Sequence, residues 1–256
     1  MDVLEALEAE TGLVAVVGAG GKKTTLYALA TRASTEGTRA VVTATVRIPI
    51  FDRQVERVVV TDDPIATVER WGGDGAEVDG WPIGVVPATE GEDRYVGYEP
   101  DGIDDLAQRG LADLVLVKAD GARTRELKAP ADHEPRIPRT ADTVVPIASV
   151  DAAGSPLSAD AVHRPERVAA ITDREIGDPI RPIDVARVLA SERGGLANVP
   201  DGATVVPLLN KVDDAAATTV AREIGTAVLD LTPRVSRVVL ARMIADDPVV
   251  DVLEFE

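Results

Sequence analysis

Two polar segments constrain this chain more than any other feature of its sequence, because each directly follows a run of apolar residues. The first begins at Gly18 after residues 13–17, and the second begins at Asn210 after residues 205–209. Short apolar runs rich in β-branched residues are typical of buried strands. Ligands of an open α/β sheet bind beyond the carboxyl ends of its strands. The two segments therefore predict an α/β fold with a ligand site to which both contribute.

The first segment has the composition of a phosphate-binding loop. Its glycines lack Cβ atoms, so that successive backbone N–H groups can face a polyphosphate, and the helix predicted after it adds the partial positive charge of its N-terminus. In such loops a lysine neutralises the terminal phosphates and a hydroxyl group ligates Mg²⁺. A plain glycine turn between a strand and a helix is the alternative. The residues predicted to contact the nucleotide here are Gly18, Ala19, Gly20, Gly21, Lys22, Lys23, Thr24 and Thr25.

The spacing of this loop leaves two assignments open. The pattern is Gly-x-x-Gly-Lys, shorter than the common Gly-x-x-x-x-Gly-Lys, and the position after Lys22, where a Ser or Thr is expected, holds Lys23. Either Lys22 binds phosphate and Thr24 or Thr25 supplies the hydroxyl group, or the loop is shifted by one and Lys23 and Thr24 carry these roles. Thr24 is the hydroxyl ligand that we expect for Mg²⁺.

The second segment has the pattern Asn-Lys-x-Asp, by which many nucleotide-binding domains hold a guanine base. The aspartate carboxylate accepts the N1 and N2 protons of guanine, whereas adenine presents an acceptor at N1, so that the pattern favours GTP over ATP. The alternative is that Asp213 or Asp214 caps the helix predicted after it. The residues predicted to contact the base are Asn210, Lys211 and Asp213.

A third element follows the apolar residues 113–119. Asp120 lies where an aspartate contacts Mg²⁺ opposite the phosphate loop, although an Asp-Gly turn is common after any strand. The segment 122–138 then carries four cationic residues, a histidine and three prolines, which prevent a helix and indicate a second-substrate or switch loop. We expect Arg123 or Lys128 to stabilise transition-state charge, and His133 to act as a general base or metal ligand. The predicted catalytic residues are Lys22, Asp120, Arg123, Lys128 and His133, and the predicted metal ligands are Thr24 and Asp120.

Apolar runs alternate with helical patterns along the chain, which predicts a mostly parallel sheet with helices on both faces. We expect a three-layer, P-loop-NTPase-like α/β fold in a single domain over residues 1–256, with a helical insertion at about 150–200. The expected strands are residues 13–17, 39–45, 57–61, 83–86, 113–119, 143–150 with a break at Pro146, 205–209, and 237–241 as the last. The expected helices are residues 24–33, 64–71, 103–108, 163–172, 183–191 and one that contains 217–228, with a loop at 72–80.

Composition excludes several classes of function. The 256 residues contain no cysteine, which excludes disulfides, thiolate metal sites and cysteine nucleophiles. A formal net charge of −17 argues against general nucleic-acid binding and is typical of adaptation to high intracellular salt. The sequence has no long apolar stretch and no basic, apolar leader, so that we expect a cytoplasmic protein without membrane contact. All five lysines lie in or beside the segments above, at Lys22, Lys23, Lys118, Lys128 and Lys211.

Several of these segments together resemble the YqeC family, whose members are described as accessory proteins of selenium-dependent molybdenum hydroxylases. The most specific match is residues 128–135, Lys-Ala-Pro-Ala-Asp-His-Glu-Pro. The resemblance implies a P-loop-type fold and a role in the maturation of a molybdenum hydroxylase or in selenium insertion. The chain departs from the family pattern at Lys23, Lys118 and Asp132, which replace a Thr or Ser, an acidic residue and a Glu. The other matching segments are residues 18–25, 118–123, 163–166 and 210–213.

Three hypotheses of function follow from these patterns. The leading one is a maturation factor that depends on Mg²⁺ and GTP, and in which nucleotide hydrolysis drives a loop rearrangement, with a molybdenum hydroxylase or its assembly proteins as partner. The second is a phosphotransferase or ligase that uses ATP or GTP on a small molecule, which the short loop and the cationic residues 123–136 motivate. The third is a nucleotide-binding scaffold without catalysis, which Lys23 at the expected hydroxyl position motivates.

Overall fold

A large sheet forms the centre of the computed structural model, which describes residues 1–72 and 80–255. Within these residues ten strands form the sheet, in the order β15-β14-β13-β10-β1-β8-β2-β5-β4, with β12 beside β10. The strands are β1 (Gly12–Gly18), β2 (Ala40–Ala44), β4 (Arg57–Val60), β5 (Ile83–Val86), β8 (Leu114–Lys118), β10 (Thr143–Ser149), β12 (Thr204–Val205), β13 (Leu208–Asn210), β14 (Arg237–Ala241) and β15 (Val249–Glu254).

The neighbouring strands are parallel except for β15, which runs antiparallel to β14. β1 lies at the centre, where Val16 pairs with Lys118 of β8 and Gly18 pairs with Ile147 of β10. Because these strands are parallel and in register, the residues that follow β1, β8, β10 and β13 all meet at one edge of the sheet.

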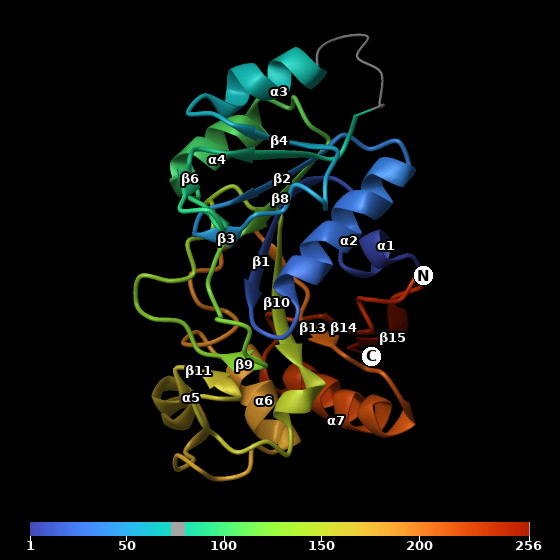
Figure 1. The fold of residues 1–256 in the computed structure, drawn as a ribbon. Coiled ribbons are helices and arrows are strands. Elements are labelled where there is room, and N and C mark those ends of the chain that lie inside the picture. The colour runs from blue at the N-terminus through green and yellow to red at the C-terminus, as the bar shows by residue number, and fades with distance from the viewer. Residues whose placement is uncertain (73–79, 256) are drawn as a thin grey trace.

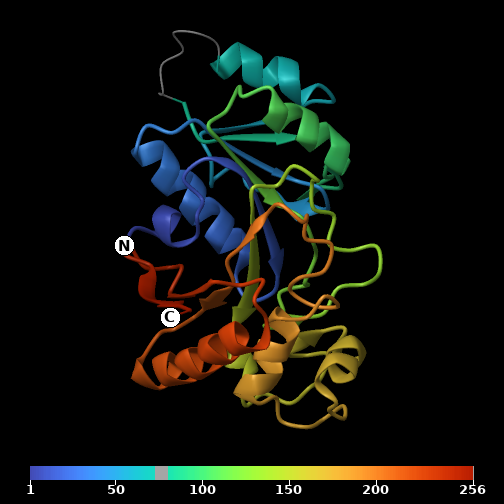
Figure 2. The same cartoon turned by 180° about the vertical axis from the view of Figure 1, so that it is seen from behind.

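Helices cover both faces of the sheet, as Figures 1 and 2 show from opposite sides. Val14 and Val16 of β1 pack in one core with α1 and α2, whereas Leu13, Ala15 and Val17 point to the opposite face, in a core with α3 and α4. On that second face α6 and α7 form a further core with β13 and β14. The predicted three-layer α/β fold is therefore confirmed. The helices are α1 (Val3–Ala6), α2 (Lys22–Thr35), α3 (Pro64–Gly72), α4 (Pro100–Gln108), α5 (Pro165–Thr172), α6 (Pro182–Leu189) and α7 (Ala215–Leu231).

Two small sheets connect the loops around the large one. The first joins β3 (Ile48–Pro49), β7 (Arg94–Tyr95) and β6 (Thr89–Glu90). The second is the parallel pair β9 (Leu127–Lys128) and β11 (Val162–His163), in which Lys128 lies opposite His163. This pair ties the long segment after β8 to the residues before α5, and it lies close to β10 in Figure 1.

Four sequence expectations are corrected by the structure. The strand expected at 205–209 is interrupted at 206–207, between β12 and β13. β10 continues through Pro146. The backbone of residue 146 faces the same side as that of Val144, whose carbonyl accepts from the N–H of Val206. On that side the neighbouring chain is interrupted between β12 and β13. The missing N–H of the proline therefore costs no ladder bond. The expected helix at 163–172 begins at Pro165, since His163 belongs to β11, and β15 rather than residues 237–241 is the last strand.

The segment at about 150–200 contains a 3₁₀ turn (Val150–Ala152), α5 and α6, and its apolar residues share one core with α7 and β14. The single-domain description remains a prediction. Most of the loop expected at 72–80 lies outside the described residues. Within the described part of the chain, no helix combines the length and the apolar character needed to cross a membrane.

Two neighbouring aspartates before α7 differ in whether they cap the helix. Asp214 is the N-cap, and its Oδ1 accepts from the N–H of Ala217 at 2.8 Å, whereas Asp213 is exposed and does not cap the helix. Replacement of Asp214 by Ala should therefore lower the free energy of unfolding by about 1 kcal/mol. Replacement of Asp213 by Ala should change it by less than about 0.5 kcal/mol.

Urea denaturation of both variants in molar KCl, followed by circular dichroism, measures this difference. An equal or larger loss for the Asp213 variant would contradict the assignment of the cap.

Candidate functional site

The predicted phosphate loop joins the carboxyl end of β1 to α2. Gly18, Gly20 and Gly21 have φ values of 88°, 84° and 134°, which other residues rarely adopt. A Cβ atom at Gly18 would lie 2.2 Å from the carbonyl oxygen of Ile147, and one at Gly21 would lie 2.1 Å from Nδ2 of Asn210. The loop requires glycine because both neighbouring strand ends press against its backbone.

In the part of the chain that the structure describes, the backbone N–H groups of this loop form two hydrogen-bonded sets with an unbonded set between them. Gly18 N donates to Oδ2 of Asp120 at 2.9 Å, and the next two N–H groups donate to backbone carbonyls at 2.8 and 2.9 Å. The first N–H that bonds within α2 is that of Thr25, which donates to Gly21 O. The four N–H groups between these sets, of residues 21–24, have no acceptor among the described residues. Because they point out of the positive end of a helix, they can bind an anion.

A row of five alternating charges runs from this loop to the start of α5. Asp120 Oδ1 lies 3.0 Å from Lys22 Nζ, and its Oδ2 lies 2.9 Å from Lys128 Nζ. Lys128 Nζ also donates to Glu134 at 2.8 Å, and Arg164 donates to the same carboxylate oxygen at 2.8 Å. We call these residues the charged row. Their order in space is Lys22, Asp120, Lys128, Glu134 and Arg164.

The charged row keeps its carboxylates ionised. Burial raises the pKa of Asp120, but the ammonium groups of Lys22 and Lys128 outweigh this effect and hold the pKa below its usual value. Burial likewise raises the pKa of Glu134, and the hydrogen bond and charge of Lys128, with those of Arg164, bring it below the usual range. Both groups therefore carry a full negative charge at neutral pH.

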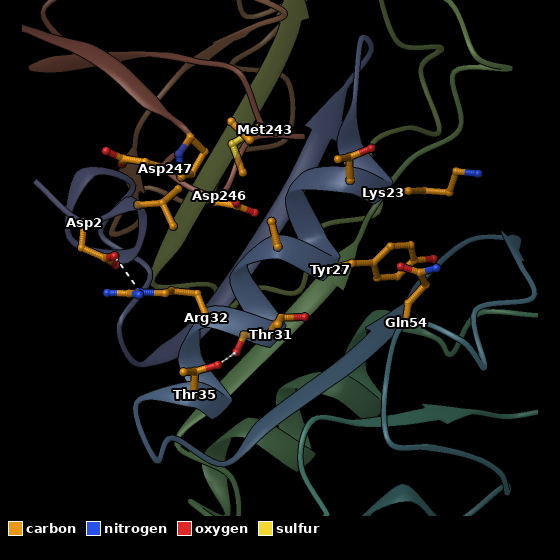
Figure 3. A pocket seen from close by; sticks show the side chains of 15 residues that line it. Asp2, Lys23, Tyr27, Thr31, Arg32, Thr35, Gln54, Met243, Asp246 and Asp247 are labelled. Atoms are coloured by element: carbon orange, nitrogen blue, oxygen red, sulfur yellow. Dashed lines mark hydrogen bonds and ion pairs between the residues drawn. The ribbon is translucent and has the colours of Figure 1, made fainter.

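The two loop lysines have different surroundings. Lys22 is buried, and its Nζ donates to Gly18 O besides pairing with Asp120. Lys23 lines a groove of about 840 Å³ along the outer surface of α2. In Figure 3, Lys23 and Tyr27 extend on one side of the helix, away from Met243 on the other. Of the two lysines, therefore, only Lys22 lies against Asp120 and the backbone of the loop.

Asn210 connects the second predicted segment to the first. Its buried side chain donates from Nδ2 to Gly20 O at 2.8 Å and accepts at Oδ1 from the N–H of Met243 at 3.1 Å. Lys211 has a φ of 64°, and its Nζ lies 2.6 Å from Glu126 and 3.2 Å from Asp151. Asn210 thus fixes this segment against the phosphate loop, and Asp213 at the end of the segment is exposed.

Two predicted catalytic residues lie outside the charged row. Arg123 and His133 are exposed, and neither side chain has a hydrogen bond or ion pair within the described part of the chain. Glu134 and Arg164 join the site although sequence reasoning did not select them. The signal for Glu134 was present, because it lies in the run 128–135 that matches the family most specifically. Arg164 lies in a second matching run, but its pairing depends on the contact between β9 and β11.

Asp120 offers an oxygen that fits a magnesium ion shared with a bound polyphosphate, whereas Thr24 lines the outer groove of α2 together with Lys23. Asp120 Oδ1 is buried and accepts no hydrogen bond, although Lys22 lies within ion-pair distance. Thr24 is half-buried at the start of α2, and Thr25 is fully buried with its hydroxyl 3.3 Å from Gly21 O. The described residues hold no group of three or more carboxylate or histidine side chains that would bind a metal alone. Mg²⁺ commonly takes one or two carboxylates and completes its shell with phosphate and water.

Residues 14–166 match the family model described as YqeC protein. The chain belongs to the YqeC family. The protein of Escherichia coli (strain K12) named "Uncharacterized protein YqeC" is 30% identical over 203 residues, which are 78% of this chain and 75% of the relative. The region that the family model matches, residues 14–166, includes the phosphate loop and the whole charged row, and it ends before Asn210.

The crystal structure of FtsY from Mycoplasma mycoides is similar with a TM-score of 0.37 and 14% identity, over 96% of this chain and 64% of that chain. The chain thus spans less than two thirds of the length of that protein.

A buried lysine beside the site makes stability depend on pH. Lys118 Nζ donates to Arg47 O at 2.8 Å, and burial, together with the charges of Lys22 and Lys128, lowers the pKa of Lys118 to about 7. The pKa of an unfolded lysine is about 10.4. Between these two pKa values the unfolded chain binds a proton that the folded chain lacks. The free energy of unfolding should therefore rise as the pH is raised from 7 towards 10.

Chemical denaturation at several pH values measures this slope in the wild type and in Lys118→Met, which keeps a long side chain without the charge. The variant should lose the part of the slope between pH 7 and pH 10. An unchanged slope would mean that Lys118 stays protonated in the folded protein.

Proposed function

We propose that this chain binds a nucleoside triphosphate with Mg²⁺ at the phosphate loop and hydrolyses it, with GTP preferred over ATP. One observation carries the proposal: the four N–H groups of residues 21–24 have no acceptor in the described part of the chain, at the N-terminus of a 14-residue helix. Four such donors in a row suit the oxygens of a polyphosphate. Lys22 stands beside them as the cation that such a ligand needs.

Each remaining residue then has a defined task. Lys22 leaves Asp120 and donates to the terminal phosphate oxygens, where it stabilises charge as the bond to the leaving group breaks. Asp120 and Thr24 would hold Mg²⁺, which when bound neutralises phosphate charge and orients the γ-phosphate for attack by water. Arg123, exposed on the loop after Asp120, is a second cation close in sequence to the reacting end.

The base would lie over the segment that begins at Asn210. Asn210 holds Gly20, and Asp213, which is free of the helix cap, accepts the N1 and N2 protons of guanine. Lys211 is fixed by Glu126 and Asp151, so that its aliphatic stem is available to the plane of the base. We further propose, from membership of the YqeC family, a role in the maturation of a molybdenum hydroxylase.

The two lysines provide a matched pair of variants. Lys22→Met should weaken binding of fluorescent GTP by roughly 10- to 100-fold, because a charge-assisted hydrogen bond is lost, and should abolish turnover. Lys23→Met should change binding by less than about threefold, as expected for a half-exposed side chain that lines the outer groove of α2 and leaves the backbone N–H in place. Equilibrium titration and phosphate release, both in molar KCl with Mg²⁺, measure the two effects.

Other results would select another function. Equal losses in both variants would contradict the assignment of Lys22. Absence of GTP and ATP binding to the folded wild type would reject the nucleotide site. Tight binding without turnover would favour the scaffold, and turnover that begins only when a small-molecule acceptor is added would favour the phosphotransferase.

The base assignment has its own test. Asp213→Asn should lower the affinity for GTP by about tenfold or more and raise that for xanthosine triphosphate, because the amide donates where the carboxylate accepted. Asp214→Asn is the matched control, since an Asn still caps α7. Competition titrations of both variants measure the ratio, and an unchanged ratio for the Asp213 variant would remove these residues from the base site.

A further inference from the structure

Lys128 has no donor left for a phosphate. Its side chain is fully buried, and Nζ lies 2.6 Å from Gly121 O, 2.9 Å from Asp120 Oδ2 and 2.8 Å from Glu134 Oε2. An ammonium group has three N–H donors, and these three acceptors use them all. To reach a phosphate, Lys128 would have to leave two buried or half-buried carboxylates. The sequence-based role for this lysine, direct stabilisation of the transition state, therefore does not fit its surroundings.

Asp120 is shared by two lysines, of which only one is free to change partner. Lys22 approaches Oδ1 from the phosphate loop, while Lys128 and the N–H of Gly18 hold Oδ2. When Lys22 turns to a phosphate, Lys128 is the one side-chain cation that stays at Asp120 among the described residues. Removal of one partner from a buried ion pair is costly because it leaves a charge without compensation. The strength of the contact between Asp120 and Lys128 therefore determines how readily Lys22 is released.

Glu134 competes with Asp120 for the same ammonium group. Its Oε2 accepts from Lys128 and from Arg164, each at 2.8 Å. Arg164 supplies this contact from a backbone with a φ of 63°, directly before α5, a conformation that costs free energy for a side-chain-bearing residue. Arg164 neutralises Glu134 and so limits how strongly Glu134 draws Lys128 away from Asp120.

We propose that Glu134 and Arg164 are positioning residues for Asp120 that act through Lys128 and thereby set the affinity of the phosphate loop. This inference rests on the proposed function, because it takes the ligand that Lys22 binds to be a nucleotide. Loss of Arg164 leaves Glu134 with Lys128 alone, so that Asp120 holds Lys22 more tightly. Loss of the Glu134 charge gives Lys128 wholly to Asp120, so that Lys22 is released more readily.

The two variants should therefore shift nucleotide affinity in opposite directions. Arg164→Ala should raise the Kd for GTP by about tenfold, and Glu134→Gln should lower it by a similar factor, the size of one charge-assisted hydrogen bond. Arg164→Lys, which keeps the charge, should restore most of the affinity. The titrations use 1 M KCl, in which the Debye length is about 3 Å. Distant charges of the protein therefore contribute little to the measured Kd.

A second ion pair provides the matched control. Arg167 donates to Asp132 at 2.8 Å and joins the same two segments, but this pair is more exposed. Its side chains have no hydrogen bond or ion pair with the charged row among the described residues, and Arg167 meets Arg164 only through the backbone. Arg167→Ala and Asp132→Asn should leave the Kd unchanged within about twofold, as expected for an exposed pair. Weaker binding in both Glu134→Gln and Arg164→Ala would show a merely structural role and overturn the proposal.

The amide resonance of Gly18 supplies a readout that needs no nucleotide, because this N–H donates to Asp120 Oδ2. In the nucleotide-free protein its proton resonance should move downfield in Arg164→Ala and upfield in Glu134→Gln, and stay in place in the two control variants. If the amide proton resonance of Gly18 stays in place in both Arg164→Ala and Glu134→Gln, the positioning role is overturned even if GTP binds. Shifts in opposite directions in a protein that binds no nucleotide would support the positioning role while rejecting the proposed function.

Discussion

The burial of one charged carboxylate, that of Asp120, is the constraint on which the rest of the site depends. A carboxylate removed from water costs several kcal/mol unless cations and hydrogen-bond donors surround it. Here Lys22, Lys128 and the N–H of Gly18 provide that compensation. The lysines are brought to it by different elements, the first turn of α2 and the short strand β9. The charge of Asp120 thus links the phosphate loop and β9 to the end of β8.

A second constraint fixes the two halves of the predicted nucleotide site to each other. Asn210 and Gly20 are separated by 190 residues and joined by a buried hydrogen bond. The same amide group leaves no space for a Cβ atom at Gly21. Gly21 is therefore required by packing against Asn210, whether or not a ligand is bound. Both segments form one surface before a nucleotide is present, which lowers the entropy lost on binding.

The sequence predicted the parts of this site that follow from local patterns. Apolar runs located the ends of β1, β8 and β13, and because parallel strands end at one edge, Gly18, Asp120 and Asn210 were expected together. The continuity of β10 was not predicted. Pro146 costs no hydrogen bond only because it lies opposite the break between β12 and β13, and a local sequence pattern does not reveal that break. The edge strand β15 was missed for a similar reason, since its place depends on pairing with β14.

The partners within the charged row could not be predicted. Glu134 and Arg164 are 30 residues apart, and their contact needs the parallel pairing of β9 with β11. The direction of a lysine side chain is also set by tertiary packing, so that Lys22 and Lys23 were indistinguishable in the sequence. Likewise the pattern around Lys128 indicated a functional cation, while only its three acceptors reveal that it holds other residues in place.

A structure of the protein with Mg²⁺ and a non-hydrolysable GTP analogue tests the central claim most directly. The account predicts phosphate oxygens on the N–H groups of residues 21–24, Lys22 Nζ moved from Asp120 to the terminal phosphates, and Lys128 still bound to Asp120 and Glu134. A nucleotide bound elsewhere, with the contact between Lys22 and Asp120 intact, would contradict it.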